Sequence, residues 1–233
     1  MATHVEGSGT HAVEREELQR DAAAPQGSGP FEVLVGGGGD PLVYGLPIFV
    51  AGSLVLGFAL IGLVPVPSAL GSVLPETTFV AGLGEFVTAV WAILLGQSIV
   101  AAIFGLFAGF WFSLFVLLEG VFHNWFVIPT AAVQGAETMF FLAWLIVFSF
   151  LTLGIVRLPI TYVGIMVFVD LAVLFNLLAV MTGAGFWFFW GGVMVLAFCA
   201  LGLYAFLNTA WASTGGRRAF PPLGPPVLRT AAQ

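Results

Sequence analysis

Lysine is absent from this chain of 233 residues, and charged side chains of either sign make up only 8% of it. A soluble domain carries about 25% charged residues, so this chain cannot build a surface that faces water on every side. The few basic residues form no stripe, which argues against nucleic acid as a partner. The single cysteine, Cys199, excludes an internal disulfide, and we interpret it as a small packing residue rather than a nucleophile.

Catalytic and metal-binding patterns are missing as well. The three histidines, His4, His11 and His123, do not combine with acidic residues or cysteine at the spacing of metal ligands. No nucleophile stands beside a base, so we expect no enzyme activity, no metal and no cofactor. The glycines at 36–39 follow an apolar run, but the sequence continues as Asp-Pro rather than as a dinucleotide-binding motif, and we interpret them as a flexible linker.

Apolar residues, in contrast, make up 60% of the chain and form long uninterrupted runs. A helix that crosses the hydrocarbon layer needs about 20 such residues. The runs therefore predict an all-α polytopic membrane protein whose six transmembrane helices form a compact bundle, because short connections make successive helices neighbours. The predicted spans are 43–64, 78–95, 99–118, 138–156, 160–181 and 186–207.

The predicted spans divide the chain into three parts. Residues 1–39 are rich in glycine, alanine and glutamate and lack apolar periodicity, so we expect a disordered cytoplasmic tail. Residues 40–210 form the predicted six-span transmembrane domain, and residues 211–233 a cytoplasmic C-terminal tail. Residues 119–137 are predicted to form an outer loop, and the polar pair Gln97 and Ser98 to make a tight turn.

All basic residues fall on one side of this arrangement. Cytoplasmic loops of membrane proteins carry an excess of arginine and lysine. The pattern therefore predicts a multi-pass protein of the plasma (inner) membrane with both termini in the cytoplasm. The residues concerned are Arg15, Arg20, Arg157, Arg217, Arg218 and Arg229.

The start of the first span carries a family resemblance. Asp40-Pro41, followed by Gly45-Leu46 and Phe49, resembles the Asn-Pro-Ala-Pro-Leu-Gly-Leu signature of the acetate uptake transporter family, which comprises bacterial acetate/succinate permeases and their fungal relatives. Asp40 replaces the usual asparagine. The resemblance continues in order along the spans, in Phe107-Ala-Gly-Phe-Trp111, Trp144, Gly154, Arg157, the run Asp170 to Ala179, Tyr204, Gly216-Arg217, Pro221 and Gly224.

This resemblance implies a function and a site. The family conducts small carboxylates through each subunit of a hexamer, past a hydrophobic constriction of three side chains. Carried over by motif, the constriction consists of Phe49, Phe107 and Leu171. A ring of apolar side chains excludes hydrated ions by dewetting yet passes a small desolvated solute. The implied partners are the lipid bilayer, a small carboxylate substrate and identical subunits of a homo-hexamer.

Three polar residues within the predicted spans are further candidates. Asp170 lies near the middle of the fifth span and Glu85 about two turns into the second. Carboxyl groups inside a membrane are costly and are functional candidates by default, as proton relays or polar groups of the pathway. Asn176 can offer an amide to the same pathway. The alternative interpretation of each is a hydrogen bond that holds neighbouring helices together.

No basic residue lies within any predicted span, which bears on the mechanism. An anion would have no full positive partner at mid-depth and must rely on dipoles and amides, or cross as the protonated acid. The leading hypothesis is therefore a transporter or channel for acetate and related short-chain carboxylates, with or without proton coupling. The alternatives are a pore for small neutral solutes such as urea, and a membrane scaffold that transports nothing.

The predicted topology is testable by cysteine labelling. We expect Glu76, His123 and Glu137 outside the cell. A Glu76→Cys variant should react with a membrane-impermeant thiol reagent in intact cells. Labelling that requires permeabilised cells would reverse the orientation.

Overall fold

The computed structural model describes residues 39–64, 70–216 and 220–228. Within them the chain is helical and forms no strand. The helices are α3 (Leu42–Leu60), α4 (Leu70–Pro75), the π-helix η1 (Glu76–Gly82), α5 (Leu83–Leu94), α6 (Ser98–Phe122), α7 (Thr130–Gly154), α8 (Ile160–Thr182) and α9 (Gly185–Ser213).

Six helical segments are long and apolar enough to cross a membrane, which confirms the predicted number of spans and the fold class. The predicted tight turn is also confirmed: α5 ends at Leu94, Gly96 adopts a positive φ of 69°, and α6 begins at Ser98. Glycine adopts this left-handed backbone conformation without the steric cost that a Cβ would add.

Two predicted boundaries are wrong. The second span begins at Gly71, upstream of Pro75, because the helix passes this proline through the π-helical turns of η1 rather than starting after it. Pro75 is the last residue of α4, and the π-helical turns of η1 begin at the next residue. The outer loop is also shorter than predicted. Glu119 lies inside α6, which continues past the apolar run to Phe122, and Glu137 lies inside α7, which begins at Thr130 directly after Pro129.

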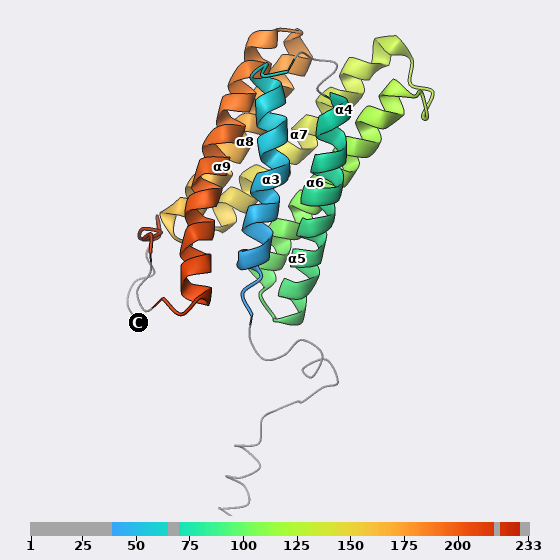
Figure 1. The fold of residues 1–233 in the computed structure, drawn as a ribbon. Coiled ribbons are helices and arrows are strands. Elements are labelled where there is room, and N and C mark those ends of the chain that lie inside the picture. The colour runs from blue at the N-terminus through green and yellow to red at the C-terminus, as the bar shows by residue number, and fades with distance from the viewer. Residues whose placement is uncertain (1–38, 65–69, 217–219, 229–233) are drawn as a thin grey trace, which may run out of the picture. The chain divides into compact units, whose positions relative to one another are not determined.

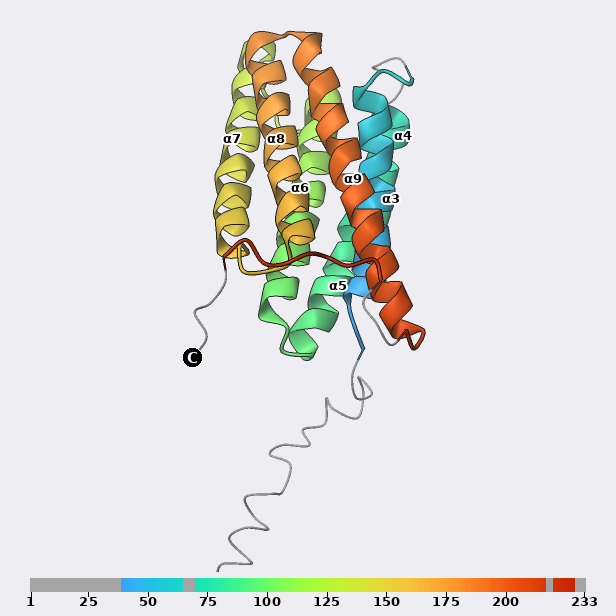
Figure 2. The same ribbon diagram turned by 90° about the vertical axis from the view of Figure 1, so that its left-hand side faces the viewer.

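The six spans form a ring in which α3 packs between α9 and α5, and α8 between α7 and α9. Figures 1 and 2 show the amino end of α3 and the carboxyl end of α9 at the same end of this bundle. We call it the terminal end, and the opposite one the far end. Arg157, in the turn between α7 and α8, is exposed at the terminal end. The other five arginines lie outside the described residues.

Part of the chain after α9 packs against the bundle. Residues 220–228, which we call the C-terminal strap, run across the terminal end beneath α7, α8 and α9 (Figure 2). The backbone N–H groups of Ile160 and Thr161 donate to carbonyls of the strap at 3.0 and 3.2 Å, which satisfies donors at the first turn of α8. The Tyr204 hydroxyl and the Asn208 amide, both on α9, donate to Pro222 and Pro221.

Glycines allow the close approach of α3 to its neighbours. A Cβ on Gly45 would lie 2.6 Å from Phe104 and from Thr88, and a Cβ on Gly52 would lie 2.4 Å from the Cβ of Ala81. Without a hydrophobic driving force between helices in lipid, such close van der Waals packing is a principal source of association. This packing brings α3 against both η1 and α6.

We expect Gly52→Ala to lower stability by about 1–3 kcal/mol, because neither Ala81 nor the backbone behind it can move away. The matched control is Gly105→Ala, whose new Cβ would meet Ala89 at an ordinary 3.7 Å. The measurement is thermal unfolding of both variants in detergent. Equal melting temperatures for the two would contradict the close contact.

Labelling sites follow from the same geometry. Glu76 lies inside a helix and is half-buried, whereas the His123 side chain is 61% exposed at the far end. His123→Cys is therefore a better accessibility probe than Glu76→Cys. The native Cys199 is fully buried and should not react.

Candidate functional site

A cavity of about 640 Å³ extends from the far end to the middle of the bundle. On α6 its lining runs from Phe122 to Phe107, roughly 22 Å along the helix axis. Five of the six spans contribute lining residues and α5 contributes none. Residues at successive turns of one face line it on each helix, for example Val169, Ala172, Val173, Asn176 and Val180 on α8.

Four phenylalanines close the inner end of the cavity. Phe107, Phe148 and Phe198 line it, and Phe49 packs behind them without lining it. Ring centroids are 5.0 Å apart for Phe49 and Phe107, 5.1 Å for Phe49 and Phe198, and 4.7 Å for Phe107 and Phe148. All four side chains are at most 4% exposed. We call this set the aromatic floor.

The aromatic floor includes two of the three residues predicted for the constriction. Phe49 and Phe107 are in contact, as the resemblance implies. Leu171 is half-buried and does not line the cavity. Residues two apart on a helix do not share a face, and α8 turns Val169 and Val173 toward the cavity instead. In the described structure the third and fourth members are Phe148 and Phe198.

Sequence reasoning missed Phe148 and Phe198, and a weak signal for one of them exists. Phe140, Trp144 and Phe148 recur at a spacing of four on α7, which places them on one helix face. Trp144 packs on Phe148 with 5.3 Å between ring centroids. In a chain with 24 phenylalanines such a spacing is hard to distinguish from chance.

The cavity wall holds few polar groups, and no Lys, Arg or His is among its lining residues. Asn176 lines it at mid-depth and is 8% exposed. Its amide nitrogen donates to the Ala172 carbonyl at 2.8 Å, which leaves the amide oxygen and one N–H for another partner. Glu137, near the far end, is the ionisable side chain of the lining.

Asp170 is not part of this wall. Its Oδ2 lies 2.7 Å from the hydroxyl of Thr152 on α7, and that hydroxyl lies 3.0 Å from the Phe148 carbonyl oxygen. The Thr152 hydroxyl is the donor in both contacts and shares its one proton between the Asp170 carboxyl on α8 and the carbonyl of its own preceding turn. The geometry supports the alternative interpretation of Asp170, a hydrogen bond that ties α8 to α7.

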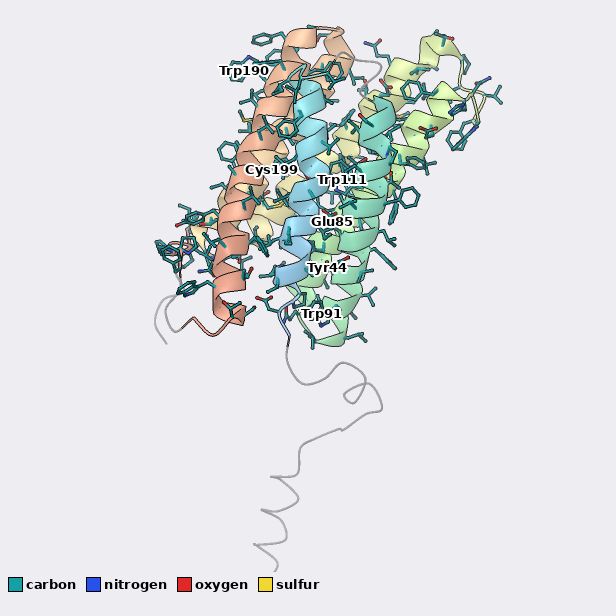
Figure 3. All side chains as sticks on the ribbon, viewed as in Figure 1. Tyr44, Glu85, Trp91, Trp111, Trp190 and Cys199 are labelled. Carbon is teal, nitrogen blue, oxygen red and sulfur yellow. The ribbon has the colours of Figure 1, made fainter. Side chains whose placement is uncertain are left out.

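Glu85 is fully buried on α5, and neither carboxyl oxygen has a formed hydrogen bond. The indole N–H of Trp111 faces it, yet this N–H is also without a formed hydrogen bond. Figure 3 shows both residues near mid-height in the bundle. Trp111 itself lines the cavity, so it lies between Glu85 and the space inside.

The opening motif has a structural part in this arrangement. The Asp40 carboxylate accepts a hydrogen bond of 3.0 Å from the backbone N–H of Leu42 and so supports the start of α3. Pro41 and Leu46 are buried, and Gly45 lets Phe104 approach the helix backbone. These residues fix the position of α3, and with it Phe49. The described residues contain no group of three His, Cys, Asp or Glu side chains that could hold a metal ion.

Known proteins share this architecture. The solved structure of the bacterial acetate channel SatP matches with a TM-score of 0.70 at 16% sequence identity, and the match covers 80% of this chain and 99% of that one. At this identity the likeness shows the fold. No curated protein matches the chain significantly. The model of the GPR1/FUN34/yaaH family matches residues 29–221, which is most of the sequence. The chain therefore belongs to the GPR1/FUN34/yaaH family.

Proposed function

We propose that this chain is a membrane channel or transporter for acetate and related short-chain carboxylates, which cross through the cavity and the aromatic floor of each subunit. The family membership and the likeness to an acetate channel support it. We further propose a homo-hexamer in the plasma (inner) membrane with both termini in the cytoplasm. The exposed Arg157 at the terminal end supports that orientation.

The observation that carries the proposal is the combination of an apolar cavity with a closed aromatic end. Its volume of about 640 Å³ falls in the range of small-molecule sites and is several times larger than acetate requires. At its inner end, in contrast, the rings of Phe49, Phe107, Phe148 and Phe198 pack with centroids 4.7 to 5.1 Å apart along the chain of contacts. Such a constriction passes a small solute that sheds its water and holds back hydrated ions.

The lining also favours one form of the substrate. An anion in an apolar cavity without a basic side chain is poorly compensated, because Asn176 supplies one amide rather than a charge. We infer that the solute crosses the floor as the neutral acid, so that a proton moves with each carboxylate. Glu137, the ionisable side chain of the lining, offers an anion no positive partner either.

The apolar lining equally suits small neutral solutes, which keeps a urea or amide pore as the second candidate. Purified protein in proteoliposomes should take up labelled acetate faster than empty vesicles do, with a smaller effect on urea. A protonophore should abolish accumulation of acetate driven by a pH gradient. Urea uptake without acetate uptake would favour the second candidate, and no flux of either solute would favour a scaffold.

The aromatic floor predicts how selectivity changes. Replacing Phe107 or Phe198 with leucine should widen the closed end and raise butyrate flux relative to acetate by about threefold or more. The matched control is Phe150→Leu on α7, whose side chain is 73% exposed and outside the lining. Flux is measured in proteoliposomes, with Leu171→Ala alongside. A change in selectivity for Leu171→Ala alone would restore the constriction that the resemblance implied.

A further inference from the structure

Glu85 combines complete burial with two unpartnered carboxyl oxygens. It lies behind the cavity wall, since α5 contributes no lining residue. An ionised carboxylate in these surroundings would have neither water nor a cation to compensate it. These surroundings favour the neutral carboxylic acid over the carboxylate, and the acid form holds one proton in the middle of the bundle.

The contacts between α5 and α6 place this proton at the depth of the aromatic floor. Gly82 lies against Trp111, and Gly105 lies 3.7 Å from Ala89. Because the two helices run in opposite directions, Glu85 lies beside the part of α6 between Gly105 and Trp111. That part contains Phe107, which belongs to the floor.

Trp111 contacts both the cavity and the buried surroundings of Glu85. Its ring lines the cavity, its N–H faces Glu85, and the whole side chain is 2% exposed. A buried N–H without a partner is costly, and the cost is recovered when an acceptor with negative charge forms beside it. An ionised Glu85 would be such an acceptor.

We propose that Glu85 exchanges a proton with the permeating carboxylate and that Trp111 controls their contact. This inference rests on the proposed function. When the Trp111 ring turns aside, the O–H bond of Glu85 breaks and an O–H bond forms on the carboxylate of the solute. The neutral acid crosses the aromatic floor, and the Glu85 carboxylate accepts the N–H of Trp111. A hydrated proton from the same side then restores the acid, so one proton moves with each anion.

Other ionisable groups do not interfere with this exchange. The elements packed against α5 are α3, η1 and α6, and their described ionisable side chains are Tyr44, Glu76 and Glu119. Tyr44 is 40% exposed near the terminal end. Glu76 is more than two helical turns from Glu85, and Glu119 pairs with His123 at 3.1 Å near the far end.

The test compares labelled acetate with acetamide, a neutral solute of the same size that needs no proton. Flux into proteoliposomes is measured above neutral pH, where acetate is almost wholly ionised. Glu85→Gln should lower acetate flux by at least about tenfold and leave acetamide flux unchanged. Trp111→Phe, which keeps a ring and removes the N–H, should lower acetate flux in the same selective way. Asp170→Asn is the matched carboxyl control and should retain both fluxes.

Each outcome decides a different point. An unchanged ratio of acetate to acetamide flux in Glu85→Gln overturns the inference while the proposed function stands. Loss of both fluxes in a folded Glu85→Gln protein assigns Glu85 a structural part and also overturns it. If Glu85→Gln does not fold, an unchanged ratio in Trp111→Phe overturns it instead. Wild-type protein that passes acetamide but no acetate contradicts the proposed function itself.

Discussion

Backbone polar groups inside a bilayer must be satisfied by the chain itself, and every span of this protein meets that requirement as a helix. The same requirement applies to polar side chains on the spans. Where a helix satisfies its own backbone, a polar side chain on it needs a neighbouring helix, its own preceding turn or a cavity for a partner. Thr152 and Asp170 bond to each other across two neighbouring helices. The hydroxyls of Thr88 and Thr77 donate to carbonyls of their own preceding turn, and Asn176 lines the cavity.

Close helix packing and an open cavity coexist because they occupy different parts of the ring. Gly45 and Gly52 bring α3 against its neighbours η1, α5 and α6. The phenylalanines of the aromatic floor come from α3, α6, α7 and α9, and the space between them and the far end is the cavity. The position of Phe49 depends on both features, since α3 must lie close for its ring to reach Phe107 and Phe198. The floor is therefore a product of helix packing as much as of aromatic content.

The fold was predictable from the sequence because apolar runs of sufficient length leave few alternatives to membrane-spanning helices. Helix boundaries were less predictable where a helix continued through a residue that was expected to end it. This happens at Pro75 in the second span and at Glu119 in α6. The site was predictable only in part. Motifs identified Phe49 and Phe107, but which face of α8 points inward depends on how that helix is rotated against its neighbours. A motif match cannot supply that rotation, so the sequence did not indicate that Leu171 would lie outside the cavity lining.

The two carboxyls Asp170, which is half-buried, and Glu85, which is buried, show why sequence position alone did not rank the polar candidates. Asp170 sits next to a residue of the implied constriction, yet its side chain points to Thr152 and away from the lining. Glu85 lies on the one span that contributes nothing to the lining, yet it is separated from the cavity by a single side chain, Trp111. Asp170 has one partner, since Thr152 donates to its Oδ2 while Oδ1 has no hydrogen bond among the described residues. Neither Glu85 oxygen has a formed hydrogen bond, and the Trp111 N–H that faces it would stabilise its ionised form, so we propose Glu85 rather than Asp170 as the proton donor.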